Sequence, residues 1–371
     1  MGEAVLPREH LLVIYYHNVP ESLPGYLEHI FPDTQITIYR SERDVPVPKE
    51  LYRQATILAT FFHVPDPEDA KNLKLVHTTS AGIDHLQHLP LLRDTQIPIS
   101  TSSGLHGPPI AEWTIMNWLI TSRGFLKTQQ AQKDHIWDRN TPGYLNSLYD
   151  QVGKRVGILG YGSIGRQIAR IAVAMGMTVH AYTASPRLTP ESRRDTGYIV
   201  PGTGDPDGSL PVSWHHGSDK ESLHKFISLG LDHLVVALPL TPQTTRLLGK
   251  EEFALLAQFN SSTTASLAPT ANSKAKPFLT NISRGRVLDQ DALIEALQDG
   301  TLGGAALDVT DPEPLPADSK LWDAPNLTIS PHTSSLGVEY FRRAMDILAL
   351  NAQRLRKGEP LINGYNRQRG Y

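Results

Sequence analysis

The chain has 371 residues, of which 40% are hydrophobic and 20% are charged, and its formal net charge is −3. This length favours two domains, because single hydrophobic cores stop growing at about 250–300 residues. The near-neutral charge offers no basic surface for nucleic acid, so we expect no nucleic-acid partner. The sequence has no cysteine, which excludes disulfides, thiolate metal ligands and cysteine nucleophiles.

The N-terminal stretch MGEAVLPREH lacks the pattern of a secretory signal, and Leu6 stands where a myristoylation signal requires Ser or Thr. No apolar run approaches the roughly 20 residues that cross a bilayer. The absence of cysteine also fits a protein that is not secreted, because secreted chains more often carry disulfides. We therefore expect a cytoplasmic protein with no membrane partner.

The first hundred residues alternate short apolar runs with polar or helical segments. Five runs rich in Val, Ile, Leu or Thr predict strands, and their spacing of about twenty residues leaves space for a helix between each pair. This pattern is typical of a parallel sheet flanked by helices. The predicted strands are residues 11–16, 35–39, 55–60, 73–78 and 97–101.

Two loops in this region follow strands directly, which is where ligands bind in open α/β sheets. The first contains Ser80, Ala81 and Gly82, whose backbone N–H groups can bind a small anion. The second, residues 101–109, leads into a helix predicted over 110–119. On these residues alone, a binding role and ordinary turn chemistry explain both loops equally well.

A strand, a tight glycine turn and a helix follow one another around residue 160. The turn consists of Gly160, Tyr161, Gly162, Ser163, Ile164 and Gly165. In such a turn the first glycine permits a sharp bend, the second leaves space for a pyrophosphate, and the third lets the helix approach the strand. The helix N-terminus offers N–H groups to anionic oxygens. The motif predicts a dinucleotide site, and the alternative is an ordinary glycine-rich turn.

The strand after this helix, predicted over residues 177–183, ends at Thr183. In an NAD site an acidic residue ends this strand and binds the ribose hydroxyls. Thr183 carries no charge that would repel a 2′-phosphate, and Thr183, Ser185 and Arg187 can bind one. The sequence therefore predicts NADPH or NADP as the cofactor, with NADH as the weaker alternative.

Two stretches interrupt the strands and helices that follow. Residues 189–222 are rich in Pro, Gly, Asp and Ser, which predicts a long loop, and residues 260–276 have the composition of a mobile surface loop. His215 and His216 lie in the first stretch. Adjacent histidines lack the spacing of a metal site and no carboxylate cluster accompanies them, so we predict a solvent-exposed loop and no metal.

Charged residues follow three of the remaining predicted strands. These strands span residues 277–283, 303–309 and 327–330, and a fourth spans residues 232–240, which include Leu238 and Pro239. Arg284 follows the first, Glu313 the second and His332 the third. If these strand ends are neighbours, the set fits carbonyl reduction. Arg284 can pair with a carboxylate beside the carbonyl and polarise it, and His332 can supply the proton as hydride arrives.

Glu313 completes this set, because a hydrogen bond to its carboxylate would raise the pKa of His332 toward working pH. Taken singly, a loop histidine is more often structural and an Arg–Glu pair is more often a surface ion pair. The prediction therefore depends on all three groups lying beside a nicotinamide site.

The order of these motifs resembles that of the D-isomer-specific 2-hydroxyacid dehydrogenases, from about residue 50 to about residue 360. The matching segments are residues 80–84, 111–112, 160–165, 239–241, 281–285 with Asp289, 307–314 and 331–332. The resemblance implies two α/β domains, Rossmann-like or flavodoxin-like, with mainly parallel sheets and a cleft between them. It implies a discontinuous substrate-binding domain, residues 1–121 and 336–371, which a helix over 336–355 rejoins. Residues 122–335 would form the dinucleotide-binding domain.

The same resemblance implies a role for each site residue. Arg284, Glu313 and His332 match the family's catalytic arginine, glutamate and histidine. Backbone groups of Ser80, Ala81 and Gly82, together with Arg284, would hold the substrate. The implied cofactor residues are 160–165, Thr183, Ser185, Arg187, Leu238, Pro239 and Asp308, of which Asp308 would face the nicotinamide. Members are typically homodimers through the nucleotide domain and its linking helices.

The implied activity is the reversible, NAD(P)H-dependent reduction of a 2-keto acid to the D-2-hydroxy acid, so the partner is a small 2-keto or 2-hydroxy acid. Glu313 stands where formate dehydrogenases of the superfamily carry glutamine, which argues against that activity. Residues 61–64 and 105–106 can line a side-chain pocket for a keto acid larger than glyoxylate. A rival function is that of a dinucleotide-sensing, co-repressor-like protein with little turnover, because some relatives use the fold in that way.

Two departures from the usual family pattern accompany this resemblance. Thr183 replaces the usual aspartate, as in NADP-preferring members. The inserts 189–222 and 260–276 resemble those of fungal members, and nothing in the sequence assigns them a role.

Overall fold

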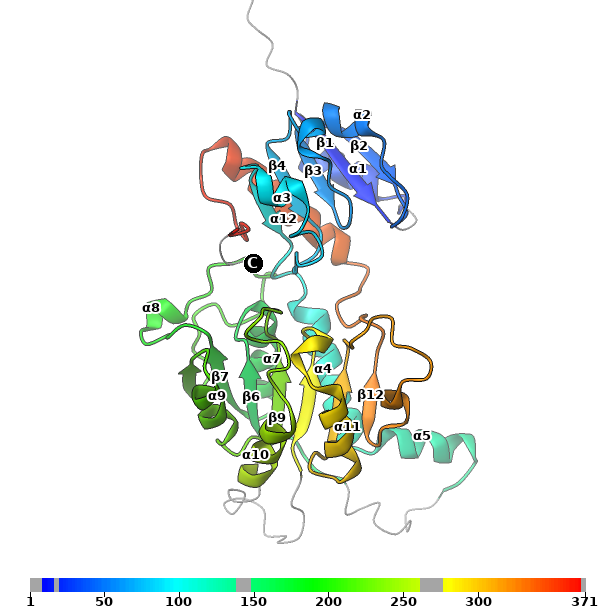
Figure 1. The fold of residues 1–371 in the computed structure, drawn as a ribbon, viewed down its shortest axis with the longest axis vertical. Coiled ribbons are helices and arrows are strands. Elements are labelled where there is room, and N and C mark those ends of the chain that lie inside the picture. The colour runs from blue at the N-terminus through cyan, green and yellow to red at the C-terminus, as the bar shows by residue number, and fades with distance from the viewer. Residues whose placement is uncertain (1–8, 17–19, 138–147, 261–275, 368–371) are drawn as a thin grey trace, which may run out of the picture. The chain divides into compact units, whose positions relative to one another are not determined.

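The computed structural model describes residues 9–16, 20–137, 148–260 and 276–367. The chain divides into two compact units, each built on a parallel sheet flanked by helices (Figure 1). Unit 1 comprises Met1–Leu105, Thr196–Tyr198 and Gly337–Tyr371, and unit 2 comprises His106–Asp195 and Ile199–Leu336. The predicted α/β class with parallel sheets is confirmed. In the part of the chain described, no helix is both long enough and apolar enough to cross a membrane.

Unit 1 contains five parallel strands in the order β2-β1-β3-β4-β5. They are β1 (His10–Tyr15), β2 (Gln35–Arg40), β3 (Ile57–Thr60), β4 (Leu75–Thr78) and β5 (Ile99–Thr101). Each overlaps one of the predicted strands. The strands β1, β3 and β4 are buried along their whole length, which explains why their sequences are continuous apolar runs without a polar alternation.

Alternate residues of β1 pack on opposite faces of this sheet, because successive side chains of a strand point in opposite directions. Leu11 and Val13 lie in one core, and Leu12 and Ile14 lie in the other. The first core includes residues of α1 (Leu23–Ile30) and α12 (Tyr340–Arg356), and the second includes residues of α2 (Lys49–Gln54) and α3 (Pro90–Asp94). A short 3-10 helix, η1 (Pro67–Asp69), follows β3. Through α12, the C-terminal segment returns to unit 1.

Unit 2 contains seven parallel strands in the order β12-β11-β10-β9-β6-β7-β8. They are β6 (Arg155–Leu159), β7 (Thr178–Thr183), β8 (Ser213–His216), β9 (His233–Val236), β10 (Phe278–Asn281), β11 (Gly304–Leu307) and β12 (Leu327–Ile329). The strand order reverses between β6 and β9. In open α/β sheets, ligands bind beyond the carboxyl ends of the strands at such a reversal.

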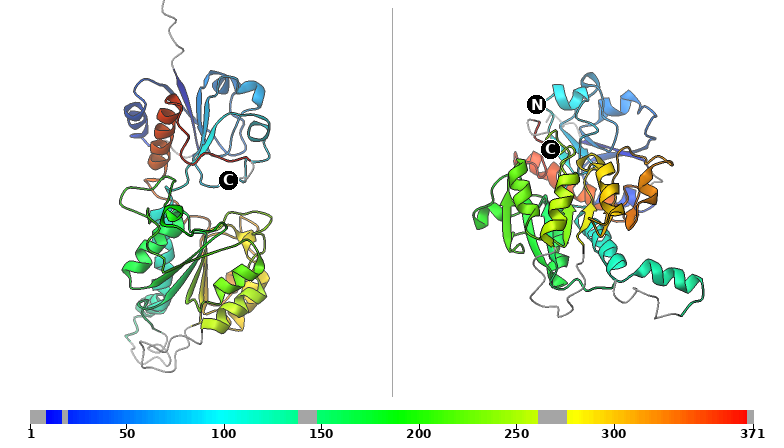
Figure 2. Two further views of the ribbon diagram at one scale, coloured as in Figure 1. Left: turned by 90° about the vertical axis from the view of Figure 1, so that its left-hand side faces the viewer. Right: turned by 60° about the horizontal axis from the view of Figure 1, so that its bottom comes forward.

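Helices cover both faces of this sheet (Figure 2). One face packs against α4 (Gly107–Ser122) and α7 (Ser163–Ala174), and the other against α9 (Lys220–Ile227), α10 (Lys250–Asn260) and α11 (Gln290–Gln298). The smaller helices are α5 (Phe125–Lys133), α8 (Pro190–Arg193), η2 (Gly285–Val287) and η3 (Lys320–Asp323). The cores on the two faces fix the strands, and so they fix the loops at the carboxyl edge.

The two compact units divide between Leu105 and His106, whereas the sequence predicts a boundary near residue 121. The helix α4 belongs to unit 2, where it packs along α7, and Trp118 Nε1 donates a hydrogen bond to Thr280 Oγ1 of β10 over 3.0 Å. Sequence periodicity detected this helix but gave no information about which sheet it would cover.

The prediction of a continuous loop over residues 189–222 is also wrong. This stretch contains α8, β8 and the first residues of α9. The strand β8 pairs in parallel with β7, with register partners from His180↔Ser213 to Thr183↔His216. The two adjacent histidines therefore lie on an edge strand. The sequence does not predict this strand, because it is short and its flanks are rich in Pro and Gly. Of the second predicted loop, residues 261–275 lie outside the described residues.

Candidate active site

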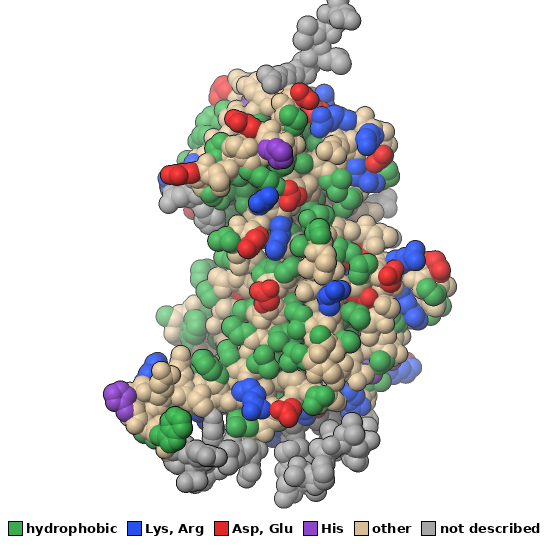
Figure 3. All heavy atoms as spheres, turned by 180° about the vertical axis from the view of Figure 1, so that it is seen from behind, with side chains coloured by type: hydrophobic (Ala, Val, Ile, Leu, Met, Phe, Trp, Pro, Cys, Tyr) green, Lys and Arg blue, Asp and Glu red, His purple; other side chains and the backbone are tan. Residues whose placement is uncertain are grey.

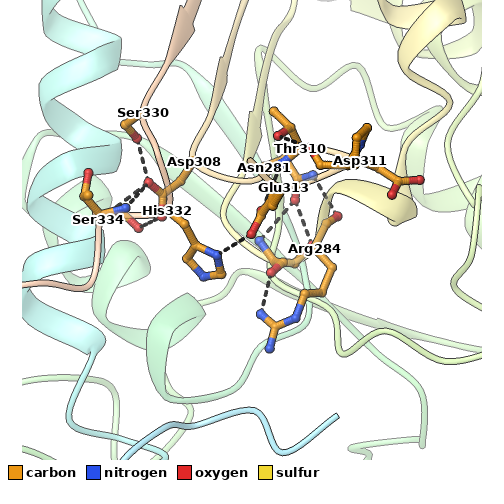
Figure 4. Close-up of polar contacts among 12 residues, drawn as sticks. Asn281, Arg284, Asp308, Thr310, Asp311, Glu313, Ser330, His332 and Ser334 are labelled. Carbon is orange, nitrogen blue, oxygen red and sulfur yellow. Dashed lines mark hydrogen bonds and ion pairs between the residues drawn. The ribbon is translucent and has the colours of Figure 1, made fainter. Parts of the chain in front are cut away.

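The strand ends that carry Arg284, Glu313 and His332 are neighbours, because β10, β11 and β12 are adjacent in the sheet of unit 2. Arg284 is the N-cap of η2 after β10, Glu313 lies in the loop after β11, and His332 follows β12. Parallel strands end at the same edge of a sheet. The three side chains therefore come together there, as Figure 4 shows.

His332 and Glu313 form a hydrogen-bonded ion pair, with His332 Nδ1 2.9 Å from Glu313 Oε2. The second carboxylate oxygen accepts the backbone N–H of Thr310 over 3.1 Å, which fixes the carboxylate plane. The hydrogen bond to Glu313 raises the pKa of His332, against the opposing effect of burial. Burial raises the pKa of Glu313, but the hydrogen bond and charge of His332 outweigh it, so this pKa lies below its usual value.

Arg284 adds a permanent positive charge to this pair. Its charge adds to the lowering of the Glu313 pKa and opposes the rise of the His332 pKa that the Glu313 hydrogen bond causes. Asn281, the last residue of β10, donates from Nδ2 to the Arg284 carbonyl over 3.1 Å. The Arg284 Nη1 donates to the Ser283 carbonyl over 2.8 Å. These bonds hold the turn that carries the arginine.

The buried carboxylate of Asp308, directly after β11, organises the loop that carries His332. Its Oδ1 accepts hydrogen bonds from Ser330 Oγ at 2.6 Å, Thr333 N at 2.8 Å and Ser334 N at 3.0 Å, and its Oδ2 accepts one from Ser334 Oγ. The resemblance assigns Asp308 to the nicotinamide and does not predict these four bonds. The sequence signal for them is the presence of Ser330, Thr333 and Ser334 around His332, with an aspartate directly after the preceding strand, β11.

The glycine turn after β6 has the geometry that a dinucleotide requires. Gly160 has a φ of +97°, and a Cβ there would lie 2.4 Å from the carbonyl oxygen of Ala237. A Cβ on Gly165 would lie 2.6 Å from the Gly160 carbonyl oxygen, so only glycine permits this close approach of helix and strand. A Cβ on Gly162 would meet nothing within 4 Å, which leaves space for a pyrophosphate above the N-terminus of α7.

The remaining predicted cofactor residues surround this turn. Leu238 and the exposed Pro239 follow β9, the neighbour of β6 on the side opposite β7. The side chain of Tyr161 is buried and donates to Asp205 Oδ2 over 2.8 Å, so it points into the protein and only its backbone lies in the turn. Ser163 and Ile164, at the start of α7, are half-buried.

Thr183 ends β7, and its Oγ1 donates to the Ser185 carbonyl over 2.8 Å. Ser185 and Arg187 are exposed just beyond the strand. The Arg187 Nη1 donates to the carbonyl oxygen of Ser192 in α8 over 2.6 Å, so the guanidinium is held close to the loop. This edge presents a hydroxyl and a guanidinium where an NAD site would place a carboxylate.

Ser80, Ala81 and Gly82 lie in unit 1, in the loop after β4. Ser80 is fixed by its Oγ, which donates to the Gly82 carbonyl over 2.7 Å, and by its carbonyl, which accepts Ser102 N over 2.9 Å. In the part of the chain that the structure describes, the backbone N–H groups of Ala81 and Gly82 make no hydrogen bond to protein. Two adjacent N–H groups of this kind can bind a carboxylate.

The segments proposed to line a side-chain pocket have different surroundings. Phe61 and Phe62, after β3, are half-buried and pack on each other with ring centroids 4.4 Å apart. Phe61 also stacks on His85, with centroids 5.5 Å apart. Leu105 is buried in the core of unit 1. Of the two predicted segments, residues 105–106 are thus buried and residues 61–64 are all half-buried.

Several known proteins are similar to this chain. Residues 115–199 and 211–334 match the model of the D-isomer specific 2-hydroxyacid dehydrogenase family, NAD binding domain. The chain is 27% identical over 290 residues to glyoxylate reductase from Thermofilum pendens, which covers 78% of this chain and 74% of that protein. It is 30% identical over 280 residues to human glyoxylate reductase/hydroxypyruvate reductase, which covers 76% of this chain and 73% of that one.

Solved structures are similar over both units. An NADPH-dependent glyoxylate/hydroxypyruvate reductase from Sinorhizobium meliloti, in complex with NADP and sulfate, is 25% identical with a TM-score of 0.71. A D-isomer specific 2-hydroxyacid dehydrogenase from Xanthobacter autotrophicus, in complex with NADPH, is 25% identical with a TM-score of 0.72. Each comparison covers 98% of this chain and 100% of the other. The chain belongs to the D-isomer specific 2-hydroxyacid dehydrogenase family, and its cofactor is a nicotinamide dinucleotide.

Proposed function

We propose that the protein reduces a 2-keto acid reversibly to the D-2-hydroxy acid, with unit 2 binding the dinucleotide and unit 1 the substrate carboxylate. The observation that carries the proposal is the His332–Glu313 ion pair beside Arg284, at the sheet edge that also bears the glycine turn. Relatives named as reductases of glyoxylate and hydroxypyruvate support the same reaction class. Membership of a family described as D-isomer specific supports the D configuration.

In this proposal His332 is the general acid. Its Nδ1 is bonded to Glu313, so Nε2 is the nitrogen that can face a substrate. A nicotinamide dinucleotide held by the glycine turn Gly160–Gly165 would supply the hydride for the carbonyl carbon. His332 Nε2–H gives its proton to the carbonyl oxygen, which becomes the hydroxyl, and the imidazolium becomes neutral. In the reverse direction Nε2 takes the proton back, and Glu313 stabilises the imidazolium that forms.

Arg284 binds the substrate in this scheme. Its planar guanidinium can pair with both oxygens of a carboxylate, and its charge polarises the adjacent carbonyl. The N–H groups of Ala81 and Gly82 would provide the second site for the carboxylate. Phe61 and Phe62 support a keto acid with an aromatic or branched side chain rather than glyoxylate, because these rings provide an apolar surface near the same edge of unit 1.

We further infer that NADPH is preferred over NADH. Thr183, Ser185 and Arg187 at the end of β7 support this preference, because they include a cation and hydroxyls but no carboxylate. Arg187→Asp should lower the ratio of kcat/KM for NADPH over NADH. An unchanged ratio would remove Arg187 from the phosphate site.

We also infer a homodimer formed through unit 2. No side chain of α5 is buried, and Phe125 and Leu126 are 48% and 60% exposed. Met116 of α4 is 46% exposed, and apolar side chains cover much of the face of unit 2 seen in Figure 3. Sedimentation should give a dimer mass, and Leu126→Glu should shift it toward the monomer. A monomer at micromolar concentration in the unmodified protein would contradict this inference.

The reaction is tested with a panel of 2-keto acids and NADPH, which includes glyoxylate, hydroxypyruvate, a branched-chain and an aryl keto acid. We expect turnover, and we expect His332→Ala to lose about 10²–10⁴-fold in kcat while still binding NADPH. Failure to reduce any keto acid, with NADPH bound normally, would favour the dinucleotide-sensing function. Glyoxylate as the best substrate would overturn the proposed substrate size but leave the reaction intact.

A further inference from the structure

His216 ends β8 directly beside Thr183, the last residue of β7. The two residues are register partners in parallel strands, and β8 is the outermost strand on that side of the sheet. The end of β7 is where a Rossmann domain binds the adenosine ribose. His216 is therefore the next strand-end side chain beyond the ribose position.

The side chains of Thr183 and His216 lie on the same face of the sheet. The preceding residues, Tyr182 and His215, both pack on Phe226 of α9, with ring centroids 5.1 Å and 5.4 Å away. Because successive side chains of a strand alternate between faces, Thr183 and His216 both lie on the face opposite α9.

The glycine turn lies on that same face. Trp214, two residues before His216, packs edge-on against Tyr161 of the turn, with ring centroids 5.0 Å apart. The backbone N–H of Gly160 donates to the Tyr182 carbonyl over 3.0 Å, so the turn also abuts the end of β7. His216 and the glycine turn therefore lie on the same face of the sheet, at its carboxyl edge.

His216 is exposed, and within the described residues its imidazole has no hydrogen bond or ion pair. The neighbouring His215 differs, because its Nε2 lies 2.9 Å from Ser213 Oγ on the other face. The nearby acid Asp219 is used as the N-cap of α9, where its oxygens accept Ser222 N over 2.8 Å and Ser222 Oγ over 2.9 Å. An imidazole N–H in this setting can donate to an anionic ligand.

We propose that His216 is a specificity-determining residue for NADPH, donating an N–H to the 2′-phosphate that Ser185 and Arg187 contact from the adjacent strand end. This inference rests on the proposed NADPH preference. A 2′-phosphate offers three acceptor oxygens and so can bind donors from two strands at once, and each charge-assisted bond is stronger than a neutral one. NADH lacks this group, so His216 affects only the phosphorylated cofactor.

The test compares binding of 2′,5′-ADP and 5′-AMP by calorimetry, because these ligands differ only in the 2′-phosphate. We expect His216→Ala to lower the affinity for 2′,5′-ADP about tenfold, which is the effect of losing one charge-assisted hydrogen bond. The affinity for 5′-AMP should not change. His215→Gln is the matched control, since it alters the adjacent imidazole on the opposite face, and it should leave the affinity ratio unchanged. Thermal unfolding of each variant checks the fold, and His216→Val, which also lacks a side-chain donor and suits a strand, replaces the alanine variant if that one does not fold.

Equal weakening of both ligands, or no weakening, would overturn the role of His216. An equal loss of affinity for 2′,5′-ADP in His215→Gln would also overturn it. The effect would then come from a general disturbance of the strand and not from the imidazole of His216. If the unmodified protein bound both ligands equally, the NADPH preference itself would fail, and this inference with it. Failure of the NADPH preference is therefore detected with the unmodified protein alone, and failure of the role of His216 is detected only with the variants.

Discussion

The backbone N–H of His332 donates to the carbonyl oxygen of Asp308 over 2.8 Å, so the residue that directly follows β11 fixes the proposed acid after β12. The carboxylate of the same aspartate binds the N–H groups of Thr333 and Ser334 (Figure 4). His332 has a φ of +56°, a left-handed conformation that costs a non-glycine residue about 1–3 kcal/mol. The bonds to Asp308 are what hold the histidine in this conformation.

Asp308→Asn should therefore impair catalysis by displacing His332. The amide keeps one acceptor oxygen and replaces the other with an N–H donor, so acceptor capacity at this loop is lost, and each buried donor left without an acceptor costs about 1–3 kcal/mol. We expect kcat to fall about tenfold or more, and the pH profile of the residual activity to change with the His332–Glu313 distance. Ser330→Ala, which removes one of the four bonds, is the control and should have a smaller effect. Unchanged kcat in Asp308→Asn would contradict this positioning role.

Glu313→Gln should shift the pH dependence of keto-acid reduction. Reduction needs protonated His332, so kcat/KM falls as pH rises through the histidine pKa. Glu313 raises that pKa by accepting the Nδ1 hydrogen bond, and it thereby extends activity to higher pH. Replacing the carboxylate by an amide should move the fall to lower pH, as measured from kcat/KM profiles with NADPH saturating. A fall at the same pH in both proteins would show that another group controls the profile.

Thr183→Asp should change the cofactor preference toward NADH. The new carboxylate would stand at the end of β7, where it can bind ribose hydroxyls and repel a 2′-phosphate. We expect the ratio of kcat/KM for NADPH over NADH to fall by tenfold or more, since one lost favourable contact and one new repulsion act together. Thr183→Val, which lacks the charge, is the control. A ratio that falls equally in both variants would implicate the hydroxyl alone.

Asp205→Ala should destabilise unit 2. The Asp205 carboxylate is buried and accepts hydrogen bonds from Tyr161 Oη at 2.8 Å, Ser209 N at 3.0 Å and Leu210 N at 3.2 Å. Its removal leaves these donors unsatisfied, at a cost of about 3–5 kcal/mol in the free energy of unfolding by urea. Asp207→Ala is the control, because that side chain is 73% exposed and should change stability by less than about 0.5 kcal/mol. Similar losses in both variants would rule out a special role for Asp205.

The sequence predicted the strands of both sheets more accurately than the boundary between the units. Apolar runs such as residues 11–16 are local signals, and β1 occupies almost the same residues. The helix α4 was equally visible, but its assignment to unit 2 depends on contacts with α7 and with Thr280, which are distant along the chain. The strand β8 was missed because four residues in a Pro- and Gly-rich stretch carry too little periodicity.

The candidate active site also depends partly on local sequence motifs and partly on tertiary structure. Sequence alone determined the glycine turn, the absence of an acid at Thr183 and the ordered appearance of Arg284, Glu313 and His332, because each of these is a local motif at a strand end. Only the tertiary structure decided that β10, β11 and β12 are adjacent, that Glu313 lies 2.9 Å from His332, and that Asp308 binds the histidine loop. Strand order and loop conformation arise from packing between residues far apart in the chain, and no local pattern encodes them.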